Sequence, residues 1–163
     1  MQDGVMVKAQ LWDTSGGEKY RAIASAHYRK ALGCLIVYDV TRRETFENVK
    51  YWIGQLLDLA EQDTCITLIG NKIDLTEDNP AEREVTYEEG MRFAASYNNM
   101  IFTETSSKRN TKVQSAFQDL LGRIYDGQKF KPAVSARHAL KIHSGLATTT
   151  PDNTAMCSCC NTQ

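Results

Sequence analysis

Two continuous apolar runs constrain the fold of this chain more than any other feature. They read "CLIVYDV" at residues 34–40 and "CITLIG" at 65–70. A strand that is apolar on both faces suits the interior of a parallel sheet, which is covered on both sides. The weaker run "MIFTET" at 100–105 predicts a further strand, and so does "VMVKAQLW" at 5–12, whose apolar residues recur at every second position.

Helical patterns fill the intervals between the predicted strands. Residues 46–60 carry one apolar stripe, and residues 113–124 carry another. Thr86 and Glu89 have the spacing of a capping box in front of a third helix. Strands that alternate with helices are joined by crossover connections, so the sequence predicts a layered α/β domain. We expect a mostly parallel sheet with flanking helices.

The last part of the chain has a different composition. From about residue 128 it becomes rich in Ser and Thr and loses its periodicity. Such segments do not bury enough apolar surface to fold, so we expect one domain over 1–126 and a flexible tail over 127–163. Three of the chain's five cysteines lie in the last seven residues. The other two lie within the apolar runs and are expected to be buried.

The charge balance and the hydropathy exclude several classes of protein. With 19 basic and 20 acidic residues, the net charge of -1 gives no sign of a nucleic-acid-binding surface. No apolar run approaches the roughly 18 residues of a membrane span, and the N-terminal residues lack a signal-peptide layout, so we expect a cytosolic chain unless something anchors it. An unrelated α/β enzyme would need a catalytic pair, and none of the three histidines has a convincing nucleophile nearby.

The motif "NKID" at residues 71–74 directly follows a predicted buried strand. The carboxylate of Asp74 can accept two hydrogen bonds from the N1 and N2 edge of guanine, which adenine cannot offer. Asn71 can bond the other edge of the base and hold the neighbouring loop, while the stem of Lys72 covers the ring. Alone, a string of this type also arises by accident.

The segment "ETSSK" at residues 104–108 follows the last predicted strand. Its small residues Ser106 and Ser107, with Lys108 after them, would let backbone N–H groups approach a carbonyl oxygen of the base. The alternative is an ordinary turn with polar residues.

A third motif, "WDTSGG", follows the strand predicted at 5–12. Asp13 could hold a Mg²⁺ ion through water, because such sites combine few carboxylates with phosphate and water. The Gly16 N–H could reach a terminal phosphate, although a plain Gly-rich turn is an equal alternative. The order of the three motifs, each after a strand, argues against accident.

Five segments carry a resemblance to a known family: "KAQLWDTSGGEKY", "RAIASAHYRKA", "IVYDVT", "GNKIDL" and "ETSSK". From residue 4 to about 126, and again at its end, the chain resembles a small GTPase of the Rab family. "YRAI" with "SAHYR" is most similar to the recycling-endosome subgroup. The resemblance implies a P-loop NTPase-type fold, binding of GTP or GDP with Mg²⁺, GTP hydrolysis, and membrane recruitment of effectors and regulators.

The chain also departs from the family pattern. The phosphate cradle G-x-x-x-x-G-K-[ST] is absent, together with the first strand, the first helix and the switch segment whose Thr binds Mg²⁺. Gly17 replaces the Gln that orients water, so even a complete version is expected to hydrolyse GTP slowly. Of the aromatic effector surface, Trp12 remains and His27 stands in place of an aromatic residue.

The absent strand raises a question of stability. By resemblance it lies between the strands predicted at 5–12 and 34–40, and buried backbone groups left unpaired cost roughly 1–3 kcal/mol each. Several such losses rival the stability of a whole domain, about 5–15 kcal/mol. Either the two strands close together or the chain is not stable alone, and we expect the sequence to be a fragment of a longer protein.

The ending "CSCCNTQ" resembles the cysteine pairs of Rab C-termini that receive geranylgeranyl groups, with Cys159 and Cys160 as the expected acceptors. Two lipid chains give stable anchoring, so the prediction is the cytoplasmic face of an endosomal or vesicle membrane, with a cytosolic pool. The expected partners are guanine nucleotide, Rab effectors and regulators, and the prenylation machinery.

Two hypotheses of function remain at this stage. The first is a membrane-traffic switch that binds and slowly hydrolyses GTP in its full-length form, while the chain as given, without a phosphate loop, is inactive alone. The second is a truncated, non-hydrolysing binding module that competes for Rab partners or for the prenylation machinery. Losing most phosphate contacts should remove most nucleotide affinity, because the remaining base contacts alone must offset the cost of association. The first hypothesis is the leading one.

Overall fold

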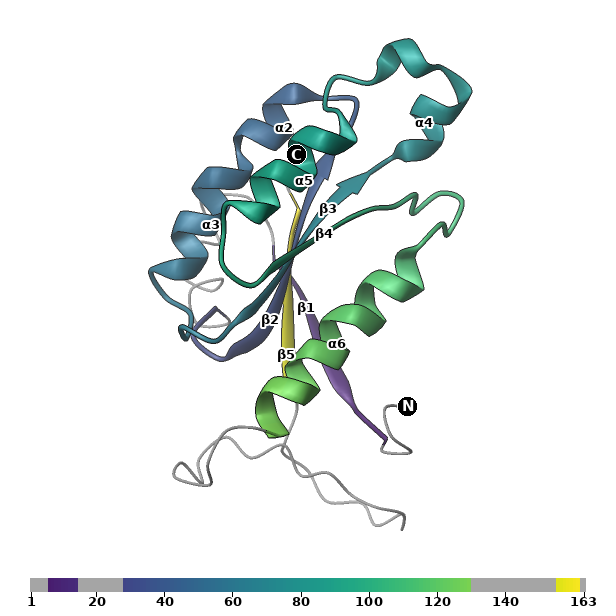
Figure 1. Cartoon of the computed structure of the whole chain (residues 1–163). Coiled ribbons are helices and arrows are strands. Elements are labelled where there is room, and N and C mark those ends of the chain that lie inside the picture. Colours follow the sequence, from purple (N-terminus) through teal and green to yellow (C-terminus); the bar gives the residue numbers. More distant parts are fainter. Residues whose placement is uncertain (1–5, 15–27, 130–154, 162–163) are drawn as a thin grey trace.

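The protein is a five-stranded parallel sheet with helices on both faces, seen here in a computed structural model that describes residues 6–14, 28–129 and 155–161 (Figure 1). The strands are β1 (Ala9–Thr14), β2 (Ala31–Asp39), β3 (Cys65–Asn71), β4 (Met100–Glu104) and β5 (Ala155–Asn161). Their order in the sheet is β1-β5-β2-β3-β4, and every pairing is parallel. The expected α/β fold is therefore confirmed.

The helices are α2 (Arg43–Glu47), α3 (Val49–Leu57), α4 (Ile73–Asp78), α5 (Tyr87–Ala95) and α6 (Val113–Lys129), with a short 3-10 turn η2 (Pro80–Glu82) after α4. Among the described helices, none combines the length and apolar composition needed to cross a membrane. The single stripe expected over 46–60 is divided between α2 and α3 at Asn48, a weak helix former.

Two buried clusters, one on each face of the sheet, hold the layers together. Ile36 and Leu68 belong to the cluster that contains Ile53 of α3, whereas Leu35 belongs to the one that contains Leu120 of α6. Successive side chains of a strand point to opposite faces, which explains why both apolar runs are apolar at every position. Helices α2, α3 and α5 thus cover one face, and α6 covers the other (Figure 1).

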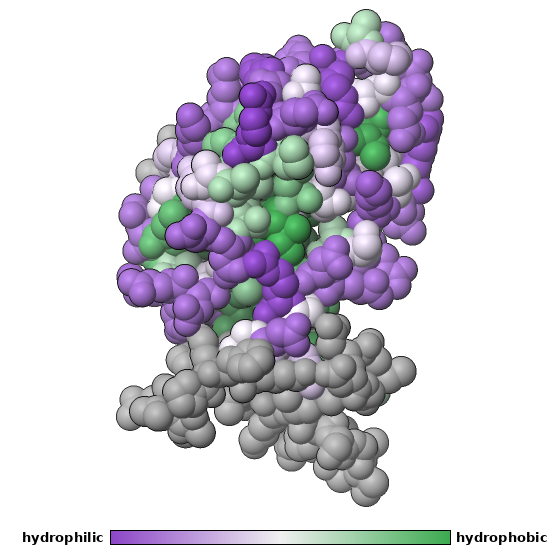
Figure 2. Space-filling model, in the orientation of Figure 1, coloured by the Kyte–Doolittle hydropathy of each residue, from purple (hydrophilic) through white to green (hydrophobic). Residues whose placement is uncertain are grey.

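The start of α5 has the expected capping box. Thr86 Oγ1 accepts a hydrogen bond from the Glu89 N–H at 3.2 Å, and the Thr86 N–H donates to Glu89 Oε2 at 2.9 Å. The helix that begins here leaves Tyr87 and Met91 partly exposed. On the side of the molecule seen in Figure 2, an apolar area lies near the middle and is surrounded by hydrophilic side chains.

The first strand differs from its prediction. A strand was expected over 5–12, but residues 6–8 are not in a strand, and β1 runs over Ala9–Thr14. Its ladder begins where Ala9 lies opposite Ala155, so the partner strand sets the start of β1. The face expected to be buried is also different, since Leu11 is 54% exposed while Thr14 is buried.

The end of the chain is the largest departure from expectation. Residues 155–161, expected to belong to a flexible tail, form β5 and pair with β1 on one side and β2 on the other. The alternative that the chain is not stable alone stays a prediction. The other alternative is wrong, because β1 and β2 do not meet. The C-terminal segment stands between them and pairs with the edges that would otherwise lack partners.

Candidate functional site

The carboxyl ends of β2, β3 and β4 meet at one edge of the sheet. Asp39 at the end of β2 lies opposite Asn71 at the end of β3, and Gly70 lies opposite Glu104 of β4. In open parallel sheets, ligands bind in the crevice beyond this edge. The polar residues that follow β3 and β4 are thereby brought together, although they lie more than 30 positions apart in the chain.

Asn71 holds the loop after β4. Its Oδ1 accepts hydrogen bonds from Thr105 Oγ1 at 3.1 Å, from the Ser107 N–H at 3.1 Å and from Ser107 Oγ at 3.2 Å. A backbone N–H only donates, so the atom that faces Ser107 must be the carbonyl oxygen. The two donors of the Asn71 amide nitrogen have no partner among the described residues, so they can serve a ligand.

Asp74 is a buried carboxylate at the start of α4. It is 3% exposed, and its Oδ1 accepts a hydrogen bond of 2.6 Å from Ser106 Oγ. This hydrogen bond lowers the pKa of Asp74 below its usual value, against the opposing effect of burial. Apart from the backbone of Asp74 itself, Ser106 is the one described residue that donates to this carboxylate, which can therefore accept further hydrogen bonds from a ligand.

Lys72 lies between these two residues in a strained backbone conformation. Its φ of 70° is in the left-handed region and turns the chain sharply from β3 into α4. Its Nζ forms an ion pair of 2.7 Å with Asp39 Oδ2, and Thr41 donates to Asp39 Oδ1. Burial acts to raise the pKa of Asp39, but the hydrogen bonds from Lys72 and Thr41 outweigh it and lower that pKa.

The loop that carries Ser106 is fixed at several points. The Ser106 hydroxyl also accepts a hydrogen bond of 3.0 Å from the Arg109 N–H, and the Arg109 side chain forms ion pairs with Glu77 and Asp78 of α4. Ser106 and Thr111 exchange backbone hydrogen bonds of 3.1 and 2.9 Å. The loop after β4 and the helix after β3 therefore form one rigid polar edge.

The structure places the other predicted site residues in different surroundings. Asp13 is exposed at the carboxyl end of β1, and Trp12 beside it is half-buried. Three strand spacings separate β1 from β3, which corresponds to about 14 Å. Lys108 is exposed in the loop after β4. Gly16, Gly17 and His27 lie outside the described residues.

Cys159 and Cys160, the expected lipid acceptors, are in β5. Cys159 lies opposite Asp13 on β1 and Leu35 on β2, and Cys160 lies opposite Thr14 and Ile36. Cys34 and Cys65 are buried, as expected.

Sequence reasoning missed two contributors to the site. Thr105 donates to Asn71 Oδ1, and Asp39 pairs with Lys72. The signal for Asp39 was its place at the end of the "CLIVYDV" run, because the ends of neighbouring parallel strands share one edge. No comparable signal distinguishes Thr105 from an ordinary turn residue.

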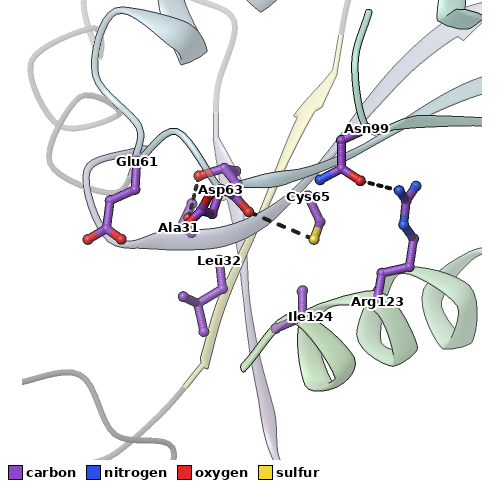
Figure 3. A pocket seen from close by; sticks show the side chains of 10 residues that line it. Ala31, Leu32, Glu61, Asp63, Cys65, Asn99, Arg123 and Ile124 are labelled. Carbon is purple, nitrogen blue, oxygen red and sulfur yellow. Dashed lines mark hydrogen bonds between the residues drawn. The ribbon is translucent and has the colours of Figure 1, made fainter. Parts of the chain in front are cut away.

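A separate cavity of about 370 Å³ lies at the amino-terminal ends of the strands, beside Ala31 of β2 and Cys65 of β3 (Figure 3). Figure 3 shows the side chain of Arg123 already bonded to that of Asn99, and Cys65 directed to the backbone oxygen of Asp63. Arg123 and Asn99, two polar side chains of the cavity, are thus already engaged with each other, and the edge with Asn71 and Asp74 remains the better candidate.

Comparison with known proteins identifies the family. The model of the Ras family matches residues 1–126, which include β1 to β4 and the polar edge. The chain belongs to the Ras family. Ras-related proteins of the Rab type share close to half of its residues in this region, so the resemblance to Rab GTPases is also confirmed.

Three relatives illustrate the extent of the similarity to this Ras-family chain. Ras-related protein RABA6a of Arabidopsis thaliana is 46% identical over 121 residues, which are 74% of this chain and 50% of that protein. Ras-related protein Rab11B of Nicotiana tabacum is 47% identical over 123 residues, 76% of this chain and 54% of that protein. Ras-related protein YPTC6 of Chlamydomonas reinhardtii is 42% identical over 151 residues, 93% of this chain and 68% of that protein. The chain spans about half the length of the first two.

Proposed function

We propose that this chain is the guanine-recognising part of a Rab-type switch that binds GTP and GDP in membrane traffic. The observation that carries the proposal is the pair Asp74 and Asn71 at the carboxyl edge of the sheet. Ser106 fixes the buried carboxylate of Asp74, while Asn71 uses its oxygen on the loop and presents its amide nitrogen outward. Membership of the Ras family supports this assignment.

The two residues supply the donors and acceptors that guanine requires. A carboxylate accepts from the N1–H and the N2 amino group of guanine, whereas adenine has an acceptor at N1. An adenine in this place would leave the buried carboxylate of Asp74 without donors, which such sites penalise strongly. The stem of Lys72, held in place by Asp39, would cover one face of the base.

The phosphates would lie toward β1, where Asp13 is exposed at the end of the strand. A single carboxylate with phosphate and water is a set of donors that Mg²⁺ accepts, so Asp13 would hold the ion through water. The ion would neutralise phosphate charge, and Gly16 would donate its N–H to the terminal phosphate. Since Gly17 has no side chain to orient water, the proposed GTP hydrolysis is slow.

The remaining parts of the proposal concern partners and location. Trp12 and His27 would belong to the surface that recognises effectors and regulators. Cys159 and Cys160 would receive geranylgeranyl groups from the prenylation machinery and anchor the protein to an endosomal or vesicle membrane.

Base selection tests the central proposal. We would titrate the chain with fluorescent GDP and compete it with ADP and xanthosine diphosphate, whose base has a carbonyl in place of the N2 amino group. Asp74→Asn should weaken GDP binding by about 10- to 100-fold and improve competition by xanthosine diphosphate, because the amide now donates where the carboxylate accepted. Asp58→Asn, at the exposed end of α3, is the matched control. Unchanged base preference in Asp74→Asn would contradict the proposal.

One observation favours the second candidate, a binding module that does not hydrolyse GTP. In this chain β5 takes the position between β1 and β2 where the resemblance expects the strand that leads to the phosphate cradle. A chain that fails to bind GDP yet captures purified Rab effectors or prenylation factors would support this candidate over the switch.

A further inference from the structure

The last strand of the chain is an interior strand of the sheet. Residues Ala155–Cys160 pair with Ala9–Thr14 of β1, and Met156–Asn161 pair with residues 31–37 of β2. In Figure 1 the yellow β5 passes through the middle of the sheet although it is the last described element of the chain. Both edges of its backbone therefore take part in ladders, which makes it the partner of two strands at once.

The chain can release this strand without disturbing the rest of the connectivity. Residues 130–154 connect β5 to α6. Fully extended, those 25 residues reach up to about 80 Å, so the length of the connection does not force β5 into the sheet. Pairing through main-chain hydrogen bonds is what holds it there, and such pairing is also how peptide strands bind exposed sheet edges.

We propose that β5 is a removable strand, and that its pairing in the sheet withholds Cys159 and Cys160 from lipid modification until it is released. An enzyme that modifies a C-terminal cysteine must bind the surrounding backbone in its own site. A segment with both backbone edges engaged by β1 and β2 cannot enter that site at the same time. The part that concerns lipid rests on the proposed function, whereas the removable strand does not.

The chemical step that depends on release uses an isoprenyl diphosphate as co-reactant. The thiolate sulfur of the cysteine attacks the allylic carbon that bears the diphosphate. A carbon–sulfur bond forms, the carbon–oxygen bond breaks, inorganic diphosphate leaves with the electron pair, and the thiol proton passes to solvent. No oxidant or reductant takes part. The proportion of chains with a free tail, set by the stability of β5 in the sheet, would limit the rate of this step.

Amide hydrogen exchange tests the strand without any reference to lipid. We would compare the full chain with Met156→Pro, because proline removes a ladder hydrogen bond and is not accommodated in an interior strand. The substitution leaves residues 157–163 unchanged. Amides of β5 and of Ala9–Thr14 should exchange at least about tenfold faster in Met156→Pro, while Met156→Val should behave like the parent. Equal exchange of the β1 amides in the parent and Met156→Pro would overturn the proposal.

A measurement on the unaltered chain keeps the test valid if Met156→Pro fails to fold. Carboxypeptidase should remove Gln163 and Thr162 and then slow at least tenfold at Asn161, because the enzyme needs an extended, unpaired end. Digestion through Ala155 at the rate of a free peptide with the same sequence would overturn the proposal.

Geranylgeranyl transfer then tests the withholding of the cysteines. With the diphosphate donor and a purified transferase, Met156→Pro should accept lipid at least about fivefold faster than the parent and Met156→Val. Equal rates in all three chains would show that pairing does not withhold the cysteines. If exchange shows release but no chain accepts lipid, the lipid attachment in the proposed function is wrong and the removable strand stands.

Discussion

Ser106 Oγ lies 2.6 Å from Asp74 Oδ1 and thereby links the loop after β4 to the helix after β3. The same hydroxyl accepts the Arg109 N–H, so one small side chain sets both the carboxylate and the loop. The edge proposed to recognise the base is therefore held in place by the protein's own hydrogen bonds.

Ser106→Ala should raise the pKa of Asp74 and weaken GDP binding. The hydrogen bond from Ser106 is the main cause of the lowered pKa of Asp74, and burial acts to raise that pKa. Removing the hydrogen bond therefore leaves the effect of burial less opposed, and the pKa rises. We expect about a tenfold loss of GDP affinity and a carboxyl titration at higher pH, followed by NMR of Asp74. Ser115→Ala, which removes an exposed hydroxyl at the start of α6, is the control and should change neither quantity.

Gly90 and Gly54 should respond in opposite directions to alanine. A Cβ on Gly90 would lie 2.4 Å from Phe102 Cζ and 2.7 Å from Tyr38 Oη, whereas a Cβ on Gly54 would meet nothing within 4 Å. Gly90→Ala should lower the free energy of unfolding by about 1–3 kcal/mol. Gly54→Ala, also within a helix, should raise it by about 0.5–1 kcal/mol. Urea unfolding measures the free energy of unfolding of both variants. Equal changes in the two variants would show that Gly90 of α5 is not packed tightly against Phe102 of β4.

Ionisation of Glu89 should make the free energy of unfolding depend on pH in the acid range. Hydrogen bonds from Arg43 and from the Thr86 backbone lower its pKa to about 2 from the ordinary 4.5. Because the pKa is depressed in the folded state, this contribution is complete above about pH 4.5 and is lost as the pH falls toward about 2. Urea unfolding between pH 6 and pH 2 measures this loss. The free energy of unfolding should fall less with decreasing pH in Glu89→Gln than in the parent. Glu88→Gln, one position earlier on α5, should retain the full decline.

Tyr38→Phe should leave the protein as stable as before or more stable. The Tyr38 ring is 1% exposed and packs 4.9 Å from the Phe46 ring, but its hydroxyl makes no hydrogen bond with any described residue. Burial raises the pKa of this phenol well above its usual range. Removing a buried donor without a partner should raise the free energy of unfolding by up to about 1 kcal/mol. Tyr87→Phe, at a partly exposed position, is the control and should change the free energy of unfolding by less than about 0.5 kcal/mol. A clear decrease of that free energy in Tyr38→Phe would show that the Tyr38 hydroxyl has a hydrogen-bond partner after all.

Features with a local cause could be predicted from the sequence. The capping box needs only Thr86 and Glu89, three positions apart, and the strand at Cys65–Asn71 needs only a continuous apolar run. The start of β1 could not be predicted, because it depends on where Ala155 pairs at the far end of the chain.

The candidate site shows the same division. The motif that contains Asn71 and Asp74 predicted its place at the edge of the sheet, because it follows a strand, and the guanine recognition it suggests stays a prediction. The ion pair between Lys72 and Asp39 depends on the register of β2 against β3, which no spacing in the sequence reveals. The strand β5 was missed because "AMCSCCN" has neither alternation nor a continuous apolar run of strand formers, and it pairs only because two edges are present.

The central place of β5 also determines when the sheet can be completed during protein synthesis. Ala9 pairs with Ala155, so β1 gains this partner only after residue 155 has left the ribosome. Contacts so distant in sequence slow folding, since the chain must close a long loop before they form. Until then β1 and β2 present unpaired edges, and a nascent chain of this protein should depend on chaperones longer than one whose central strand is made first.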